Sequence, residues 1–413
     1  MKAEFGRVKV VDLELSRPAT AIEELGDYVS VYGLVRHHGV PIGWVRVPVA
    51  RARCSASEVT RALEEQLPST IRIGGSADPT WTARGLPSVT VAVCTRDRPD
   101  DLTLCLESLR SLDYPELDLL VVDNAPKDEG TARLVQDRFP EVRYLRESRP
   151  GLDWARNRAI AAARGEIIAF TDDDVVVDVG WVRALAAVFH KDPAVMTVTG
   201  IVVPYELETE AQVLFERYRS FARGFAFSRT QIPNVAGRSV AFRYGATGQF
   251  GTGANMAFRR ELFDRLGLFD PGLGAGTPAR GGDDLDMFFR VLKAGHALVY
   301  EPRALVRHRH RRTAEELQRQ MRDHGISFSA YLARSWRAYP EERGGIARLA
   351  AWWAAKILYR AVRPRGAPKA ALRRLALAEM GGLFVGPRCY QKATSAAAVQ
   401  SLGRAHANMM EGT

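Results

Sequence analysis

Three consecutive aspartates, Asp172, Asp173 and Asp174, follow the apolar run 167–170 and constrain the chain more than any other feature. Carboxylates this close repel one another by about 4 kcal/mol per pair at an effective dielectric constant near 20. A cation must offset this repulsion, and oxygen ligands of this kind suit Mg²⁺ or Mn²⁺. The alternative, for the triplet taken alone, is a solvated acidic loop after a strand.

Two earlier apolar runs also end in polar residues. Residues 89–94 lead into Thr95, and residues 117–122 lead into Asp123. Short runs of Val, Leu and Ile separated by helical stretches indicate a parallel sheet that is covered on both faces. Ligands bind such sheets at the carboxyl ends of the strands. We therefore expect Thr95, Asp123 and the aspartate triplet to share one crevice.

Two helices are predicted between these strands. One has Asp100 as its N-cap and a sheet-facing stripe that ends at Leu109. The other covers residues 152–163 and places Arg156 among its apolar positions. A buried arginine needs a partner, which the strand-end carboxylates or a ligand phosphate could supply. Alternatively, only the stem of Arg156 packs and its head reaches solvent.

The chain has neither of the common glycine-rich phosphate motifs. No G-x-G-x-x-G follows the first predicted strand, and no G-x-x-x-x-G-K-[ST] occurs. The phosphates of a nucleotide would then be held mainly by a metal and by separate hydrogen-bond donors.

Taken together, ordered segments of the chain resemble the family 2 inverting glycosyltransferases of GT-A fold, over roughly residues 87–312. The segments are 91–99, 121–124, 155–157, 170–174, 253–255, 282–286 and His308. The resemblance implies an α/β fold with a Rossmann-like, mostly parallel sheet flanked by helices. It also implies a transferase that uses Mg²⁺ or Mn²⁺ and a nucleotide-diphosphate sugar, most simply a UDP sugar, with a glycan, a lipid-linked molecule or a small molecule as acceptor.

The resemblance also implies roles for the matching residues. Asp174 and His308 are the implied metal ligands, although His308 could instead be a structural residue at a strand end. Asp172 is expected to lie toward the ribose, and Asp173 to share either task. The implied donor-binding residues are Thr95, Arg98, Asp123, Arg156, Asp172, Asp173 and Asn255.

The implied catalytic residues are Asp283 and Asp284. The resembling family has Glu-Asp here, and its second carboxylate is the usual general base, so Asp284 is the expected base. Because this chain has the shorter Asp at the first position, the division of labour between the two residues stays open. Acidic residues in a first helical turn are also favoured by capping and the helix dipole alone.

Three functions are compatible with these residues. The expected one is a single displacement in which Asp284 accepts the proton of an acceptor hydroxyl and the anomeric configuration inverts. A nucleotidyltransferase of related architecture would need a basic loop after the first strand, and residues 95–99 are too short and acidic for one. A noncatalytic nucleotide-sugar-binding protein is disfavoured by the intact carboxylates.

Composition predicts three regions. Residues 1–86 form an accessory α+β domain and a linker, residues 87–312 the catalytic domain, and residues 313–413 a basic helical region. In the first region, two strands flank a longer hairpin loop at 37–41, and Ser55 and Glu58 form a capping box. Its function, including a role in a homodimer, is open.

Basic charge is concentrated near the C-terminus. Residues 303–413 carry 21 Lys and Arg against 7 Asp and Glu, whereas the whole chain has a net charge of +10. An apolar stripe in this region either lies on an anionic membrane or packs on the catalytic domain. The stripe consists of Ile346, Leu349, Ala350, Trp353 and Ile357, and the nearby Trp352 is flanked by Arg348, Lys356 and Arg360. No nucleic-acid-binding module accompanies this charge.

Scattered cysteines and the lack of an apolar leader or of a long apolar stretch make the reducing cytoplasm the default location. Peripheral attachment to the inner face of the membrane is the open alternative.

Overall fold

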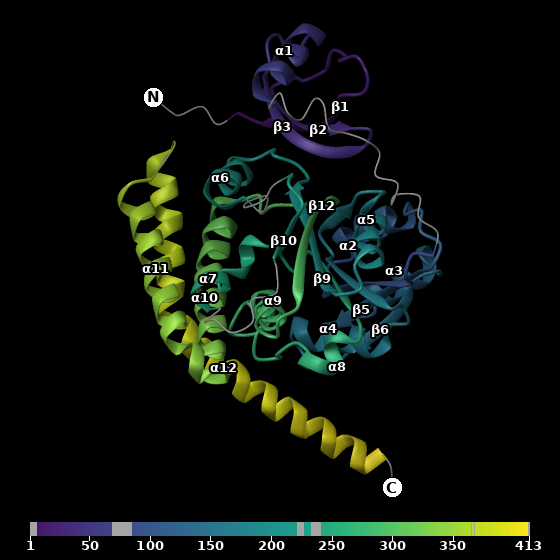
Figure 1. The fold of residues 1–413 in the computed structure, drawn as a ribbon, viewed down its shortest axis with the longest axis vertical. Helices are drawn as coiled ribbons and strands as arrows, with labels where there is room; N and C mark the ends of the chain where they lie inside the picture. The colour runs from purple at the N-terminus through teal and green to yellow at the C-terminus, as the bar shows by residue number, and fades with distance from the viewer. Residues whose placement is uncertain are drawn as a thin grey trace.

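The computed structural model describes residues 6–67, 85–220, 227–232, 241–364, 366 and 368–411. Its centre is a nine-stranded sheet in the order β10-β12-β9-β11-β7-β4-β5-β6, with β8 paired to β12 (Figure 1). The strands are Val89–Thr95 (β4), Leu117–Asn124 (β5), Arg143–Glu147 (β6), Ile167–Asp172 (β7), Val175–Val177 (β8), Val195–Pro204 (β9), Thr230–Ile232 (β10), Asn255–Arg259 (β11) and Ala297–His308 (β12).

Most of these strands run in one direction. β4, β5, β6 and β7 pair in parallel, as do β9 and β12, whereas β8, β10 and β11 run antiparallel to their neighbours. The predicted α/β fold with a mostly parallel sheet is confirmed. The parallel pairing also brings the ends of β4, β5 and β7 to one edge, as the sequence predicted.

Helices cover both faces of the sheet. Helices α2 (Pro99–Arg110), α3 (Gly130–Arg138) and α5 (Trp181–Lys191) pack on one face, and α4 (Leu152–Ala162), α8 (Leu262–Leu266) and α9 (Asp283–Lys293) on the other. Alternate side chains of β4 enter the two cores, since Val91 and Val93 face α2 while Ala92 faces α4. Helix α2 begins at Pro99 with Arg98 as N-cap, so the predicted cap Asp100 lies inside the first turn. Proline suits that first position because it lacks an N–H.

The N-terminal residues form a small α+β unit with its own core, as predicted. It comprises β1 (Val8–Glu14), β2 (Ser30–His37), β3 (Val40–Pro48) and α1 (Ala56–Gln66), whose capping box is present. The predicted longer hairpin loop is wrong. His38 and Gly39, with φ of 50° and 77°, instead form a two-residue turn whose left-handed backbone matches the twist of the strands. Most of the predicted linker, residues 68–87, lies outside the described residues.

This unit sits against one end of the main sheet (Figure 1). The Val8 N–H donates to the Leu207 carbonyl over 2.9 Å. Leu34 of β2 packs with Ile201 of β9 and Leu305 of β12. The predicted domain boundaries at residues 86 and 312 stay predictions. Strand β4 begins just after residue 86, and the first C-terminal helix begins just after residue 312.

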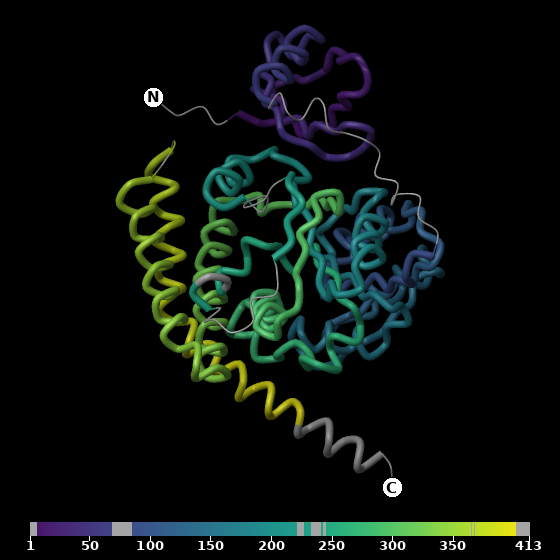
Figure 2. The backbone as a smooth tube through the Cα atoms, viewed as in Figure 1, coloured from purple at the N-terminus to yellow at the C-terminus, as the bar shows by residue number. Residues whose placement is uncertain are grey.

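Helices of the C-terminal region form a layer beside the sheet (Figure 2). They are α10 (Ala314–Ala338), α11 (Arg343–Val362) and α12 (Lys369–Glu411), which pack with α6 (Glu210–Arg219) and the short α7 (Ala241–Tyr244). In the predicted stripe of α11, Ile346, Leu349 and Ile357 are buried, and Trp353 stacks on Phe328 at 4.2 Å. The membrane interpretation of that stripe is therefore wrong, and the packing alternative is confirmed. None of the described helices combines the length and apolarity needed to cross a bilayer.

Glycines allow α10 and α12 to approach until their backbones touch. A Cβ atom on Gly382 would collide with the Arg322 carbonyl oxygen, whereas a Cβ on the adjacent Gly381 would meet nothing within 4 Å.

We expect Gly382→Ala to lower the free energy of unfolding by about 1 to 3 kcal/mol, because the added methyl group forces the helices apart. Gly381→Ala is the matched control and should stabilise the protein by up to about 1 kcal/mol, since alanine favours an open helical position. Urea unfolding of both variants measures the difference. Equal stability of the two variants would contradict this packing.

Candidate active site

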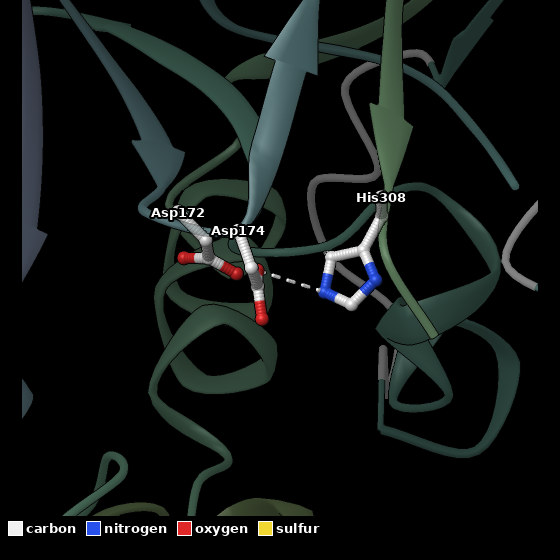
Figure 3. Close-up of side chains that lie close together, drawn as sticks. All are labelled: Asp172, Asp174 and His308. Atoms are coloured by element: carbon white, nitrogen blue, oxygen red, sulfur yellow. Dashed lines mark ion pairs between the residues drawn. The ribbon is translucent and has the colours of Figure 1, made fainter. Parts of the chain in front are cut away.

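Two aspartates of the triplet and one histidine form a cluster at the sheet edge (Figure 3). Asp172 ends β7, Asp174 immediately precedes β8, and His308 ends β12. Because β8 pairs with β12 so that Val175 lies opposite His308, the sheet register brings the histidine to the aspartates. One ligand atom from each of the three side chains lies within 4.8 Å of the others, and His308 Nε2 is 3.2 Å from Asp174 Oδ1.

This donor set fits a divalent cation, since two carboxylates and one imidazole are ligands that Mn²⁺ and related ions accept. The structure brings the predicted ligands Asp174 and His308 together. It adds Asp172, for which the sequence resemblance implied a place near the ribose.

Neighbouring positive charges hold the carboxylate of Asp174 in its ionised form. Burial alone would raise the pKa of Asp174, but His308 and Arg98 outweigh that effect and hold the pKa below its usual range. Arg98 Nη2 lies 3.1 Å from Asp174, and Arg311 Nη1 lies 4.0 Å from it. Burial, followed by the neighbouring charge of Asp174, raises the pKa of Asp173 to about 7. The three aspartates of the triplet thus have different environments.

Asp173 is held by protein partners from the first βα connection. Thr95 Oγ1 donates to one of its oxygens over 2.7 Å, and Arg98 Nη1 donates to the other over 2.6 Å. Asp173 is buried, and this anchoring fixes the turn that carries Asp172 and Asp174. Thr95, Arg98 and Asp173 therefore meet at the site, whereas their direct contact with a donor stays a prediction.

Asp123 lies at the end of β5, two strands away from β7, and is fully buried. The Tyr144 hydroxyl, which comes from β6, donates to its Oδ2 over 2.9 Å. Burial raises the pKa of Asp123 despite this bond. Sequence reasoning missed Tyr144, and an aromatic residue in the next strand of a parallel sheet is the signal that could have found it.

Arg156 is buried and links the acidic groups of the site. Its guanidinium forms an ion pair with Asp283 and lies 3.7 Å from Asp153 and 4.0 Å from Asp172. Of the predicted strand-end carboxylates, Asp172 lies near Arg156, whereas the close partner Asp283 comes from the start of α9. The alternative in which the Arg156 head reaches solvent is wrong. A Cβ atom on Gly253 would lie 2.7 Å from Arg156 Nη2, so the missing side chain makes room for the guanidinium.

Asp283 and Asp284 open α9 but have different environments. Asp283 is buried against Arg156. Asp284 is partly exposed, and its oxygens accept from the backbone N–H groups of Gly253, over 2.9 Å, and Leu285, over 2.8 Å. Of the two carboxylates, Asp284 is therefore the more accessible to a substrate.

The position of Asn255 does not suit the direct contact with the donor that the sequence resemblance implied. It is fully buried in β11, its Nδ2 donates to the carbonyls of Ile201 and Ala304, and its Oδ1 accepts from Trp181 Nε1 over 2.9 Å. These bonds occupy the amide, so Asn255 positions the strands β9, β11 and β12 beside the cluster. The pattern Gly-Ala-Asn does not reveal which way a strand side chain points.

A family model described as glycosyl transferase family 2 matches residues 90–267, the part of the chain that supplies Thr95, Asp123 and the aspartate triplet. Residues 90–267 are therefore similar to family 2 glycosyltransferases. The mostly parallel sheet with helices on both faces agrees with the GT-A fold that the sequence resemblance implied.

Relatives of the matched region share low identity with it. A glucosyl-dolichyl phosphate glucuronosyltransferase of Haloferax volcanii is 23% identical over 233 residues, which are 54% of this chain and 69% of that protein. A pre-mycofactocin glycosyltransferase of Mycobacterium tuberculosis is 28% identical over 229 residues, 54% of this chain and 43% of that protein.

Among solved structures, the mannosyltransferase PcManGT of Pyrobaculum calidifontis, in complex with GDP-Man and Mn²⁺, aligns with a TM-score of 0.49 and 19% identity. The alignment covers 74% of this chain and 88% of that one.

Proposed function

We propose that this chain is an inverting, metal-dependent glycosyltransferase that moves a sugar from a nucleotide-diphosphate sugar to an acceptor hydroxyl. The position of Arg156 carries this proposal, because its guanidinium lies between Asp283, next to the candidate base, and Asp172 of the candidate metal cluster. Burial and the charge of Asp174 raise the pKa of Asp172, the charges of Arg156 and His308 lower it, and the charge of Asp284 raises it further. The proposed base and the proposed cation site therefore lie close to each other.

The proposed reaction is a single displacement. Asp284 accepts the proton of the acceptor hydroxyl while the hydroxyl oxygen attacks the anomeric carbon from the face opposite the nucleotide. Asp283 stays paired with Arg156 and positions the start of α9. A divalent cation held by Asp172, Asp174 and His308 would supply positive charge for the departing diphosphate.

A panel of UDP and GDP sugars tests this function. We expect one nucleotide class to bind in calorimetry with Mn²⁺ and to lose binding when EDTA is added, and we expect slow release of free sugar from that donor. No binding by any donor would contradict the transferase proposal. Release of pyrophosphate from a nucleoside triphosphate and a sugar phosphate would favour the nucleotidyltransferase instead.

We also propose that the basic region 313–413 contacts an anionic membrane surface, from its excess of Lys and Arg. A UDP sugar as donor and homodimer formation rest on the sequence alone and stay predictions.

A further inference from the structure

A basic cavity of about 340 Å³ opens on the side of the molecule formed by α6, α11 and the start of α12. Half of the residues that line it are cations, and none of the described lining residues is acidic. They are Arg217, Tyr218, Lys356, Tyr359, Arg360, Arg363, Pro364 and Leu372. A cavity with this lining favours an anion.

The positive charge around the cavity is incompletely compensated. The fully buried carboxylate Glu379 lies 2.7 Å from Arg219 and 3.8 Å from Arg360, so one negative charge serves two arginines. The Nη1 atom of Arg360 is buried without a hydrogen bond to any described residue. Arg363 has no ion pair within the described part of the chain. An added anion would therefore gain both charge neutralisation and hydrogen bonds.

Beside the cavity, α11 exposes a second apolar row, on the side opposite its buried stripe. Leu358 and Val362 are 57% and 68% exposed, and Trp352 and Tyr359 are nearly half exposed. Tyr359 also lines the cavity, and Lys356 lies 4.6 Å over the Trp352 ring. Figures 1 and 2 show α11 at the edge of the molecule. Exposed apolar and aromatic side chains beside cations are typical of helices at the membrane interface.

We infer that this surface docks on an anionic bilayer, with the apolar row of α11 at the acyl boundary and the phosphate of a lipid headgroup in the cavity. The phosphate is held by Arg360 and Arg363, and Tyr359 bridges the two parts of the surface. The inference deepens the membrane association proposed above, and it concerns binding that is measured without any sugar transfer.

Sedimentation of the full-length chain with vesicles of phosphatidylglycerol and phosphatidylcholine at low salt tests this inference. Each unit charge at an anionic surface contributes about fivefold to binding, so Arg363→Glu should weaken it about thirtyfold. The double variant Leu358→Ser and Val362→Ser should weaken it also, by loss of apolar burial. Arg133→Glu, at an exposed position of α3, is the control with the same change in net charge. It should weaken binding only through that change in net charge, and therefore less than Arg363→Glu does.

Three results would overturn the inference. The full-length chain staying in solution with anionic vesicles excludes the bilayer as the partner. Equal loss in Arg363→Glu and Arg133→Glu excludes the cavity, because net charge would then explain the binding. Inorganic phosphate that binds in calorimetry in an Arg363-dependent way, without vesicle binding, assigns the cavity to a soluble phosphate. Donor hydrolysis measured without vesicles reports on the active site independently, so the two proposals fail separately.

Discussion

Replacing Asp284 by asparagine should reduce sugar transfer at least a hundredfold while donor binding survives. The carboxylate is the proposed proton acceptor, and general-base catalysis contributes about 10² to 10⁴ to a rate. Its neighbour Asp283 is ion-paired with Arg156, so Asp283 cannot easily replace it as the proton acceptor. Transfer rates measured with the donor found in the nucleotide-sugar panel, together with calorimetry of that donor, separate the two effects.

The local structure sets a condition on this test. Both carboxylate oxygens of Asp284 accept from backbone N–H groups, and the NH₂ of an asparagine cannot accept. Some loss of stability is therefore expected, and the unfolding midpoint of Asp284→Asn must be measured beside its activity.

Asp283→Asn is the matched comparison, because it leaves the proposed base intact and weakens the pairing with Arg156. A severe defect in Asp283→Asn with a mild one in Asp284→Asn would show that the roles are reversed.

Asp174→Ala should abolish the metal-dependent part of nucleotide diphosphate binding and match the effect of a chelator on the unmodified protein. The variant removes the carboxylate that lies within reach of both His308 and Arg98. It leaves Asp172 and His308, which together are too few ligands to hold a divalent cation firmly. Calorimetry with and without Mn²⁺ measures the loss.

Asp118→Ala is a suitable control. Asp118 is also a strand aspartate paired with an arginine, Arg143, but it lies at the opposite end of β5 from Asp123. It should lose some stability and keep metal-dependent binding. Undiminished, metal-independent binding in Asp174→Ala would remove the cluster from the proposed site.

Sequence reasoning located the crevice because the carboxyl ends of parallel strands must meet at one edge. The apolar runs before Thr95, Asp123 and Asp172 were enough to predict this, and β4, β5 and β7 confirm it. Long-range contacts were harder to predict. Helical spacing showed that Arg156 needs a partner, but the identity of that partner as Asp283 depends on how α4 and α9 pack on the same face of the sheet.

The side of α11 that we propose to face a membrane could not be predicted, for a different reason. The helix is apolar on two sides, one containing Ile346 and Ile357 and the other Leu358 and Val362. Periodicity identifies both sides equally well. Only the packing of α11 on its neighbours shows that the first is covered. The same limit applies to Asn255, whose side-chain direction depends on the carbonyls of β9 and β12 that accept its hydrogen bonds.

The position of His308 on β12 determines how far the proposed catalytic unit extends along the chain. The family match ends at residue 267, whereas Asp284 and His308 lie beyond it, on α9 and on a strand paired with β8, β9 and β10. A shortened protein that ended at residue 267 would keep the two aspartates of the candidate metal cluster but lose the proposed base, the histidine and an interior strand. Transplanting this candidate site into another scaffold would therefore require everything from β4 through His308.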